Sequence, residues 1–288
     1  MKGEKIPAII IQGISSLGVV VMVFILFFLV KEGVPVLSEA TIGDLLSGKY
    51  WYPTEEPGVF GMLPLILGTL SVTFLSSLIA VPFSLLVAIF IAEVAPDWMH
   101  DVLKPVLEIL GFFPSIILGF LGMILIAPWL QDKFTLITGL NMFNASLLLG
   151  IMVLPIVSSL SEEALSSVPR ELRDAAYALG STRWETISKV VFPYALPGIL
   201  GGTLLGIMRG LGETMVVLMA AGGAAIIPRS IFDPVRPLTS TIAAEMGETP
   251  VGSVHYHALF FAGLILLIMT LIINFLSMWI ESKGRLNK

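Results

Sequence analysis

The sequence predicts an all-α membrane protein with six transmembrane helices. Of its 288 residues, 56% are hydrophobic and 13% are charged, whereas soluble domains carry about 25% charged residues. The mean hydropathy is +0.95. The apolar residues are also gathered into long runs that reach or exceed the ~20 residues needed to cross a bilayer. Together these three observations exclude a soluble globular domain.

Six apolar runs define the expected spans. They cover residues 8–30, 61–94, 105–130, 141–160, 194–227 and 258–280. The first run has 23 residues, more than the ~7–15 of a signal-peptide core, so we expect an uncleaved helix. The second has 34 residues and contains Pro82, which predicts one long, kinked or tilted helix. In the third, Gly119 and Gly122 have a spacing that lets membrane helices pack closely.

The polar segments on one side of these spans suggest surface roles. Residues 31–60 end in Tyr50, Trp51, Tyr52 and Phe60, which we expect to anchor the chain at the membrane surface. Stacking on a ligand is the alternative for Trp51. Residues 228–257 carry charges of both signs and are predicted to form an external gate or a docking surface for a soluble partner.

Several classes of site are not indicated. The chain has no cysteine, which excludes disulfides and thiolate metal sites. His255 and His257 are close in sequence but have no third ligand nearby, so no metal site is predicted. The net charge of −5 implies no nucleic-acid partner.

The basic residues predict the orientation of the chain. Ten of the 16 lie in the two termini and in residues 95–104 and 161–193. Five lie on the opposite side, and Arg209 lies within the fifth run. Because positive charge favours the cytoplasmic side, both termini and residues 161–193 are expected in the cytoplasm.

Residues 161–193 form the most charged segment, and its helix signals predict two short helices with a tight corner. Pro169 suits a first helical turn, and Ser167 could cap it. Gly180 suits the end of that helix, and Thr182 with Glu185 fits the capping box of a second one. Leu172, Ala175, Ala176 and Leu179 would share one face of the first helix. Pro193 and Pro197 would then return the chain to the membrane.

Two interpretations of this segment remain open from the residues alone. Small apolar side chains beside Arg and Trp suit docking into a groove on another protein. An amphipathic loop lying on the membrane surface would show the same pattern.

The spacing of this segment resembles the EAA loop of binding-protein-dependent ABC importer permeases. Asp174-Ala175-Ala176 is followed after three residues by Gly180, and after nine more by Val-Val-Phe and Pro193. The departures from the family pattern are Asp for Glu, Val for Ile and Phe for Leu. The resemblance implies the type I ABC importer permease fold and a loop that inserts into a separate ATP-hydrolysing subunit. We call residues 161–193 the coupling loop.

The chain itself shows no sign of being the ATPase, because it has no G-x-x-x-x-G-K-[ST] motif. We therefore expect a transport subunit rather than an enzyme, with no cofactor of its own. ATP and Mg would be used by the partner ATPase.

Arg209 and Glu213 lie within the fifth apolar run, four residues apart. A charged residue at mid-bilayer costs at least ~2.5–3.5 kcal/mol, so it usually faces a cavity or a partner. The two side chains could neutralise each other and fix helix packing. Alternatively, the planar fork of Arg209 could contact an oxyanion on its pathway while Glu213 prevents trapping. Gly210 and Gly212 would allow close backbone approach there.

The stretch from Arg209 to Thr214, R-G-L-G-E-T, resembles PstC-type phosphate permeases, as do residues 60–70 and 108–115, Trp51-x-Pro53 and Thr270…Asn274. This resemblance implies transport of inorganic phosphate, with the essential Arg and Glu of that family carried by Arg209 and Glu213. It also implies a PstA-like second permease in a heterodimer, an ATP-binding subunit dimer, an extracytoplasmic phosphate-binding protein, and a multi-pass location in a prokaryotic inner membrane.

The expected organisation has three parts. Residues 1–60 form an N-terminal transmembrane helix with an extracytoplasmic loop, residues 61–280 the permease core with its coupling loop, and residues 281–288 a cytoplasmic tail. The alternatives are a permease for molybdate or sulfate, an ion-driven secondary carrier, and a membrane receptor that moves nothing.

Overall fold

The computed structural model describes residues 5–286, with side chains for residues 12–280. The basic side chains counted at the termini (Lys2, Lys5, Lys283, Arg285 and Lys288) therefore lie outside the described part. Within it, six helices are long and apolar enough to cross a membrane. They span Gln12–Ser38, Leu63–Val94, Ser115–Phe134, Met142–Ser166, Arg183–Leu211 and Val254–Ile280. The predicted six-span, all-α fold class is confirmed.

The first half of the chain contains most of the short elements. Its elements are α1 (Lys5–Gly33), the 3-10 helix η1 (Val34–Ser38), α2 (Ile42–Ser47), β1 (Trp51–Tyr52), β2 (Val59–Phe60), α3 (Leu63–Ile89), the π-helix η2 (Phe90–Val94), α4 (Asp97–Gly111), α5 (Ser115–Leu121), the π-helix η3 (Gly122–Ile126) and α6 (Ala127–Phe134). The two strands form an antiparallel hairpin in which Trp51 pairs with Phe60.

The second half contains the central helix and the coupling loop. Its elements are α7 (Met142–Ser166), α8 (Arg170–Ala178), α9 (Arg183–Thr186), the π-helix η4 (Ile187–Val191), α10 (Phe192–Leu211), α11 (Met215–Ala220), α12 (Leu238–Glu245) and α13 (Val254–Leu286).

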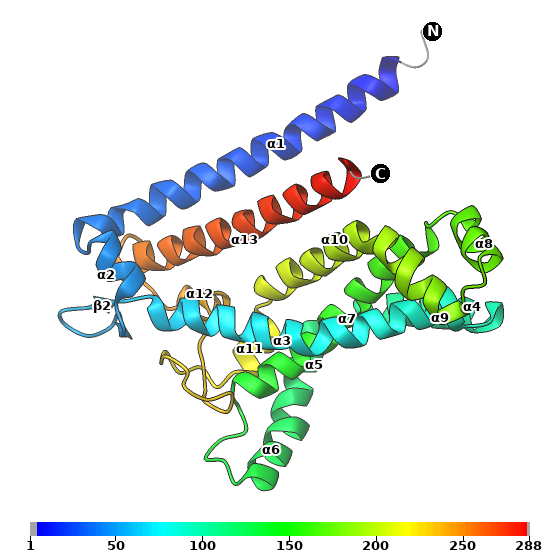
Figure 1. Cartoon of the computed structure of the whole chain (residues 1–288). Coiled ribbons are helices and arrows are strands. Elements are labelled where there is room, and N and C mark those ends of the chain that lie inside the picture. Colours follow the sequence, from blue (N-terminus) through cyan, green and yellow to red (C-terminus); the bar gives the residue numbers. More distant parts are fainter. Residues whose placement is uncertain (1–4, 287–288) are drawn as a thin grey trace.

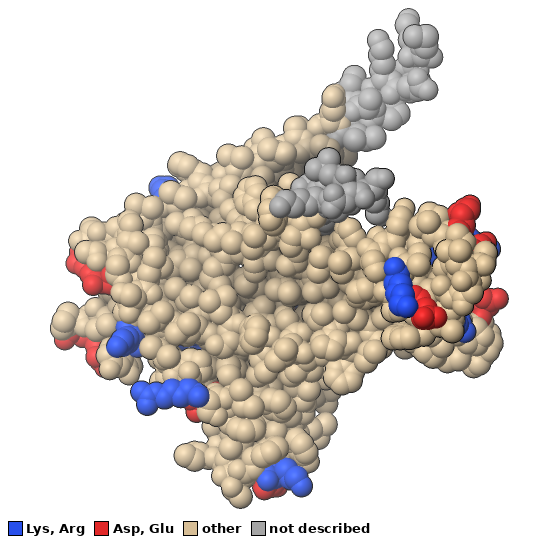
Figure 2. Space-filling model, in the orientation of Figure 1, with Lys and Arg blue, Asp and Glu red and all other residues tan. Residues whose placement is uncertain are grey.

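Long helices join the two ends of the molecule (Figure 1). One end carries α4, α8 and α9 and is called the α8 end; the other carries α2 and the β1–β2 hairpin and is called the hairpin end. α1 begins and α13 ends on the side where α8 lies, and the two helices run side by side. On the face shown in Figure 2, charged side chains gather at the two ends and near α6, with an uncharged band between them. An apolar band of this kind suits a bilayer core.

Helix α7 is the centre of the bundle and packs against both α3 and α10. Hydroxyl groups join α7 to α3: Ser146 donates to the Val72 carbonyl (3.3 Å), and Ser84 donates to the Leu154 carbonyl (3.2 Å). These bonds satisfy polar groups that would be costly to leave unpaired in a membrane.

A glycine at every fourth position of α10 faces α7. A Cβ at Gly202 would lie 2.7 Å from Cβ of Leu160, and one at Gly206 would lie 2.4 Å from a methyl group of Val157. Gly198 and Gly210 meet α7 in the same way. The two backbones therefore approach more closely than side chains would permit. Gly119 and Gly122 pack against α11 and α7, which confirms the packing role expected of them.

The boundaries predicted for the third span, residues 105–130, are wrong. Residues Asp97–Gly111 form the amphipathic helix α4, and the apolar span begins only at Ser115. The chain breaks between them because Pro114 disfavours helical geometry at the residue before it. The second span agrees with prediction: α3 is one long helix that includes Pro82.

The fourth and fifth spans extend into the segment predicted to be a loop. α7 continues to Ser166, and the helix that starts at Arg183 runs without interruption into α10. The expected separate second helix is therefore wrong. In the π-turn of η4 the Phe192 amide bonds the Ile187 carbonyl. This altered bonding accommodates Pro193, which lacks an N–H, without ending the helix.

Trp51 is not an exposed membrane anchor. It is 3% exposed and packs edge-on against Phe60 and His255. Its indole N–H donates to the Glu245 carboxylate at 3.1 Å. Burial of this ring satisfies its one donor, and the same contacts argue against the ligand-stacking alternative. Tyr50 and Tyr52 remain exposed, as expected.

Candidate functional site: the coupling loop and a membrane arginine

The corner of the coupling loop is built by local backbone chemistry. The α8 helix ends at Ala178, and Gly180 follows its C-cap with a φ of +86°, which favours glycine. The Ser181 amide bonds the Ala176 carbonyl (3.1 Å), and the Gly180 amide bonds the Tyr177 carbonyl (2.9 Å), the pattern of a Schellman motif. Thr182 and Glu185 then form the predicted capping box, with bonds of 3.0 and 3.3 Å.

The start of α8 differs from the expectation. Pro169 is its N-cap and makes no side-chain cap, and Ser167 is instead the C-cap of α7. α7 continues so far into the loop that only two residues separate its last helical turn from Pro169.

The outer surface of the corner exposes large apolar side chains. Leu179 is 89% exposed and Trp184 is 66% exposed. Leu172 and Ala175 are exposed as well, whereas Ala176 turns inward and is buried. The expected four-residue face therefore presents three of its members. Exposed large apolar side chains on a rigid corner suit a contact surface.

The inner surface of the corner is polar and faces α3. Arg173 pairs with Glu93 of η2 (Nη2–Oε1, 2.7 Å) and also donates to the Leu165 and Val168 carbonyls. Arg183 donates to the backbone carbonyl of Glu93. Sequence reasoning missed Glu93 because it precedes Arg173 by 80 residues and belongs to no motif.

A second charged contact joins α4 to the inner end of α7. The Lys104 ammonium lies 2.8 Å from one carboxylate oxygen of Glu162, and the other oxygen accepts from the Ser166 hydroxyl. The hydrogen bond to Glu162 raises the pKa of Lys104 above its ordinary value. Together with Glu93, Glu162 fixes the base of the coupling loop to its neighbours.

Arg209 and Glu213 lie where the fifth span breaks. Arg209 is in the last turn of α10, which ends at Leu211. The neighbouring Gly210 packs on Leu149 and Val153, in the middle of α7. The arginine therefore lies level with the middle of the bundle, as expected. No neighbouring backbone approaches Gly212 closely, in contrast to the expectation. A Cβ placed on Gly212 would have the Met208 carbonyl oxygen, 3.8 Å away, as its nearest neighbour.

The Arg209–Glu213 pair is strongly asymmetric. The Nη1–Oε2 distance is 2.8 Å, but the Arg209 side chain is 48% exposed and that of Glu213 only 4%. The other oxygen of Glu213 accepts from the amides of Met215 (3.1 Å) and Val216 (3.4 Å) at the start of α11. Glu213 is therefore held in place by backbone groups as well as by Arg209.

Glu213 is the only partner of the Arg209 guanidinium among the side chains described here. A guanidinium has five N–H donors, so most of those on Arg209 are open to solvent or to an anion. This is the geometry expected of a pathway residue. Arg209 also neutralises the buried Glu213 carboxylate. A role in helix packing and a role in contacting an oxyanion are therefore both compatible with this arrangement.

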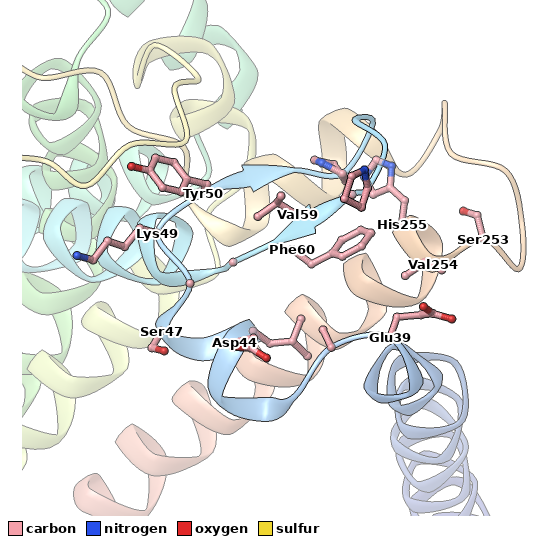
Figure 3. Close-up of a pocket in the computed structure, with 17 residues that line it drawn as sticks. Glu39, Asp44, Ser47, Lys49, Tyr50, Val59, Phe60, Ser253, Val254 and His255 are labelled. Atoms are coloured by element: carbon pink, nitrogen blue, oxygen red, sulfur yellow. The ribbon is translucent and has the colours of Figure 1, made fainter.

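The hairpin end holds an open groove of about 800 Å³ between the segment after α1, the hairpin and the start of α13 (Figure 3). Its lining includes Glu39, Asp44, Lys49 and Tyr50. These charged residues belong to residues 31–60; of residues 228–257, which are expected to form a gate or docking surface, only Ser253, Val254 and His255 line the groove. His255 bonds Glu245 (2.8 Å) and His257 bonds the Glu32 carbonyl (2.7 Å). These two histidines have separate partners, and residues 12–280 show no cluster of three metal-ligating side chains.

The fold defined by this geometry is that of ABC importer permeases. The solved MetNI methionine ABC transporter, described in inward-facing conformations, matches with a TM-score of 0.61 at 21% identity. That match covers 80% of this chain and 99% of the transporter chain. A bacterial alginate ABC transporter matches with a TM-score of 0.58 at 15% identity over 92% of each chain. Similarity at this level of identity establishes the fold.

Sequence comparison establishes the family. Residues 84–283 match the model of the binding-protein-dependent transport system inner membrane component, and the chain belongs to this family. The PstC phosphate transport permease of Pasteurella multocida is 36% identical over 81% of this chain and 79% of its own length. The probable ABC transporter permease YqgH of Bacillus subtilis is 38% identical over 84% and 78%. The chain is thus a multi-pass inner-membrane permease subunit of PstC type, a transport component rather than an enzyme.

Proposed function

We propose that this chain forms half of the channel of an ABC importer for inorganic phosphate. The observation that carries the proposal is Arg209, a half-exposed guanidinium level with the middle of the bundle and engaged by one carboxylate. Arginine binds tetrahedral oxyanions through its planar fork. Support comes from relatives named as phosphate transport permeases, among them a probable PstC of Methanocaldococcus jannaschii that is 30% identical over 94% of this chain.

The partners belong to the same proposal. A PstA-like permease completes the channel, an ATP-binding dimer receives the exposed corner of α8 and α9, and an extracytoplasmic phosphate-binding protein docks at the hairpin end. ATP and Mg are used by the ATP-binding dimer. The α8 end and both termini then face the cytoplasm, in agreement with the excess of basic residues on that side.

The proposed cycle follows alternating access. ATP closes the ATPase dimer, and its pull on Asp174 to Pro193 opens the gate at the hairpin end. Phosphate released by the binding protein passes Arg209, and hydrolysis resets the channel toward the cytoplasm. Glu213 competes with phosphate for the guanidinium, which keeps Arg209 from holding the anion permanently.

Reconstitution tests the substrate. The four-component complex is placed in liposomes with internal ATP, and uptake of radiolabelled phosphate is measured with and without excess sulfate or molybdate. We expect uptake to require ATP and the binding protein and to resist both competitors. Uptake of molybdate or sulfate in preference to phosphate would show a permease for another oxyanion. Uptake without ATP would show an ion-driven carrier, and no uptake by the complete complex would favour a receptor.

A further inference from the structure

The two arginines on either side of Gly180 converge on one residue of the second span. Arg173 binds the Glu93 carboxylate and Arg183 binds the Glu93 backbone carbonyl. Glu93 is 8% exposed at its side chain and Arg173 is 17% exposed. Both α8 and α9 are therefore attached to η2, which continues α3. The attachment of α8 is a buried ion pair, and that of α9 is a surface contact.

Apolar packing makes this attachment rigid. The ends of α3, α7 and α10 share a buried cluster at the α8 end, made of Ala88, Leu165, Val168, Val191, Ala195 and Ile199. Interiors packed in this way transmit displacement instead of absorbing it. The π-turn η2 ends the second span and contains Glu93, and the π-turn η4 leads from the coupling loop into α10. Such turns are common at functional positions in helices.

The far part of α3 is bonded to the segment that holds Glu213. The Thr69 hydroxyl accepts a hydrogen bond from the Leu238 amide (2.9 Å). The next residue, Thr239, donates to the Glu213 carbonyl (2.8 Å). One continuous helix thus joins Glu93 at the α8 end to the backbone beside the Arg209–Glu213 pair.

We propose that Glu93 is a positioning residue that transmits movement of the coupling loop along α3 to Arg209 and Glu213. A pull on α8 and α9 is transmitted to Glu93 through Arg173 and through Arg183. It displaces α3 as a unit. Thr69 then shifts the backbone of Leu238 and Thr239, on which Glu213 rests. The proposal rests on the proposed function, since it assumes that an ATPase moves the loop.

The test measures phosphate transported per ATP hydrolysed in the reconstituted complex. In Glu93→Gln we expect ATP hydrolysis to continue while this ratio falls ~5-fold or more, the lower range of an allosteric coupling. Glu108→Gln is the matched control, because it makes the same carboxylate-to-amide change at an exposed position of α4, outside the coupling loop. Its ratio should stay within ~2-fold of wild type.

A double-variant cycle tests the route. Thr69→Val removes the acceptor of the Leu238 amide, and we expect it to lower the ratio too. If both residues act on one route, the Glu93→Gln/Thr69→Val complex will be no worse than the worse single variant. Losses that multiply would overturn a shared route, and an unchanged ratio in Glu93→Gln would overturn the role of Glu93.

A further variant covers failure of assembly. Arg183→Gln removes only the surface contact and leaves Glu93 paired with Arg173. It replaces Glu93→Gln in the transport measurement if the Glu93→Gln complex does not co-purify with its partners. A ratio equal to wild type in Arg183→Gln would then count against the proposal. Failure of the proposed function looks different, because wild type and Glu108→Gln would then also transport no phosphate.

Discussion

Two arginine–glutamate pairs in this chain have nearly the same length but different surroundings. Arg173 lies 2.7 Å from Glu93, and Arg209 lies 2.8 Å from Glu213. Arg173 is mostly buried and also donates to two backbone carbonyls. Arg209 is 48% exposed, and its other donors make no further bond within residues 12–280.

The comparison separates a structural pair from a candidate functional one. An arginine whose donors are used by its own fold can hold two elements together but has nothing to offer a ligand. An arginine with open donors can bind an anion. Its carboxylate partner competes with that anion for the guanidinium and so favours release of the anion. Burial and donor use distinguish the two pairs, whereas distance does not.

Arg173→Gln is the substitution expected to cost most stability. It leaves the Glu93 carboxylate buried without its charged partner, which should destabilise the fold by about 3–5 kcal/mol. Thermal unfolding of the purified complex in detergent measures this. A melting temperature equal to wild type would break the comparison, because Arg173 would then not be a structural residue.

Gly180→Val comes next and sharpens the role of the corner. A β-branched residue at φ +86° should cost about 1–3 kcal/mol of strain and disturb the exposed surface around Leu179. We expect weaker co-purification of the ATPase subunit. Gly180→Asn is the control, since asparagine tolerates positive φ; equal loss in both variants would point away from backbone geometry.

Thr182→Ala should have the smallest effect. It removes the hydroxyl that caps α9 and should cost about 1 kcal/mol. Because α9 is continuous with the fifth span, helix packing limits the damage to its first turn. Hydrogen exchange at the Glu185 amide should accelerate while transport persists. Global unfolding on this change would mean that the cap supports more than the corner.

The local features of the coupling loop could be predicted from sequence because short-range chemistry determines them. The glycine at positive φ and the Thr182–Glu185 capping box depend on neighbouring residues alone. The break before Pro114 also has a local cause, but hydropathy obscured it. α4 is apolar on one face, so its residues 105–111 merged with the run that follows.

The features that escaped prediction depend on residues distant in the sequence. The burial of Trp51 depends on Glu245, 194 residues away, whose carboxylate accepts a hydrogen bond from the indole N–H. Glu93 meets Arg173 only after α3, α7 and α8 have packed together. The sequence placed Arg209 and Glu213 within the fifth apolar run, whereas the end of α10 at Leu211, before Glu213, and the asymmetry of their exposure required the fold.

The most direct test of the account is uptake of radiolabelled phosphate by the reconstituted complex carrying Arg209→Gln. Glu213 keeps the amides of Met215 and Val216, so the complex should assemble and hydrolyse ATP. We expect phosphate uptake to fall to the level of liposomes without ATP. Wild-type uptake by an intact Arg209→Gln complex would contradict it and would make Arg209 a packing residue.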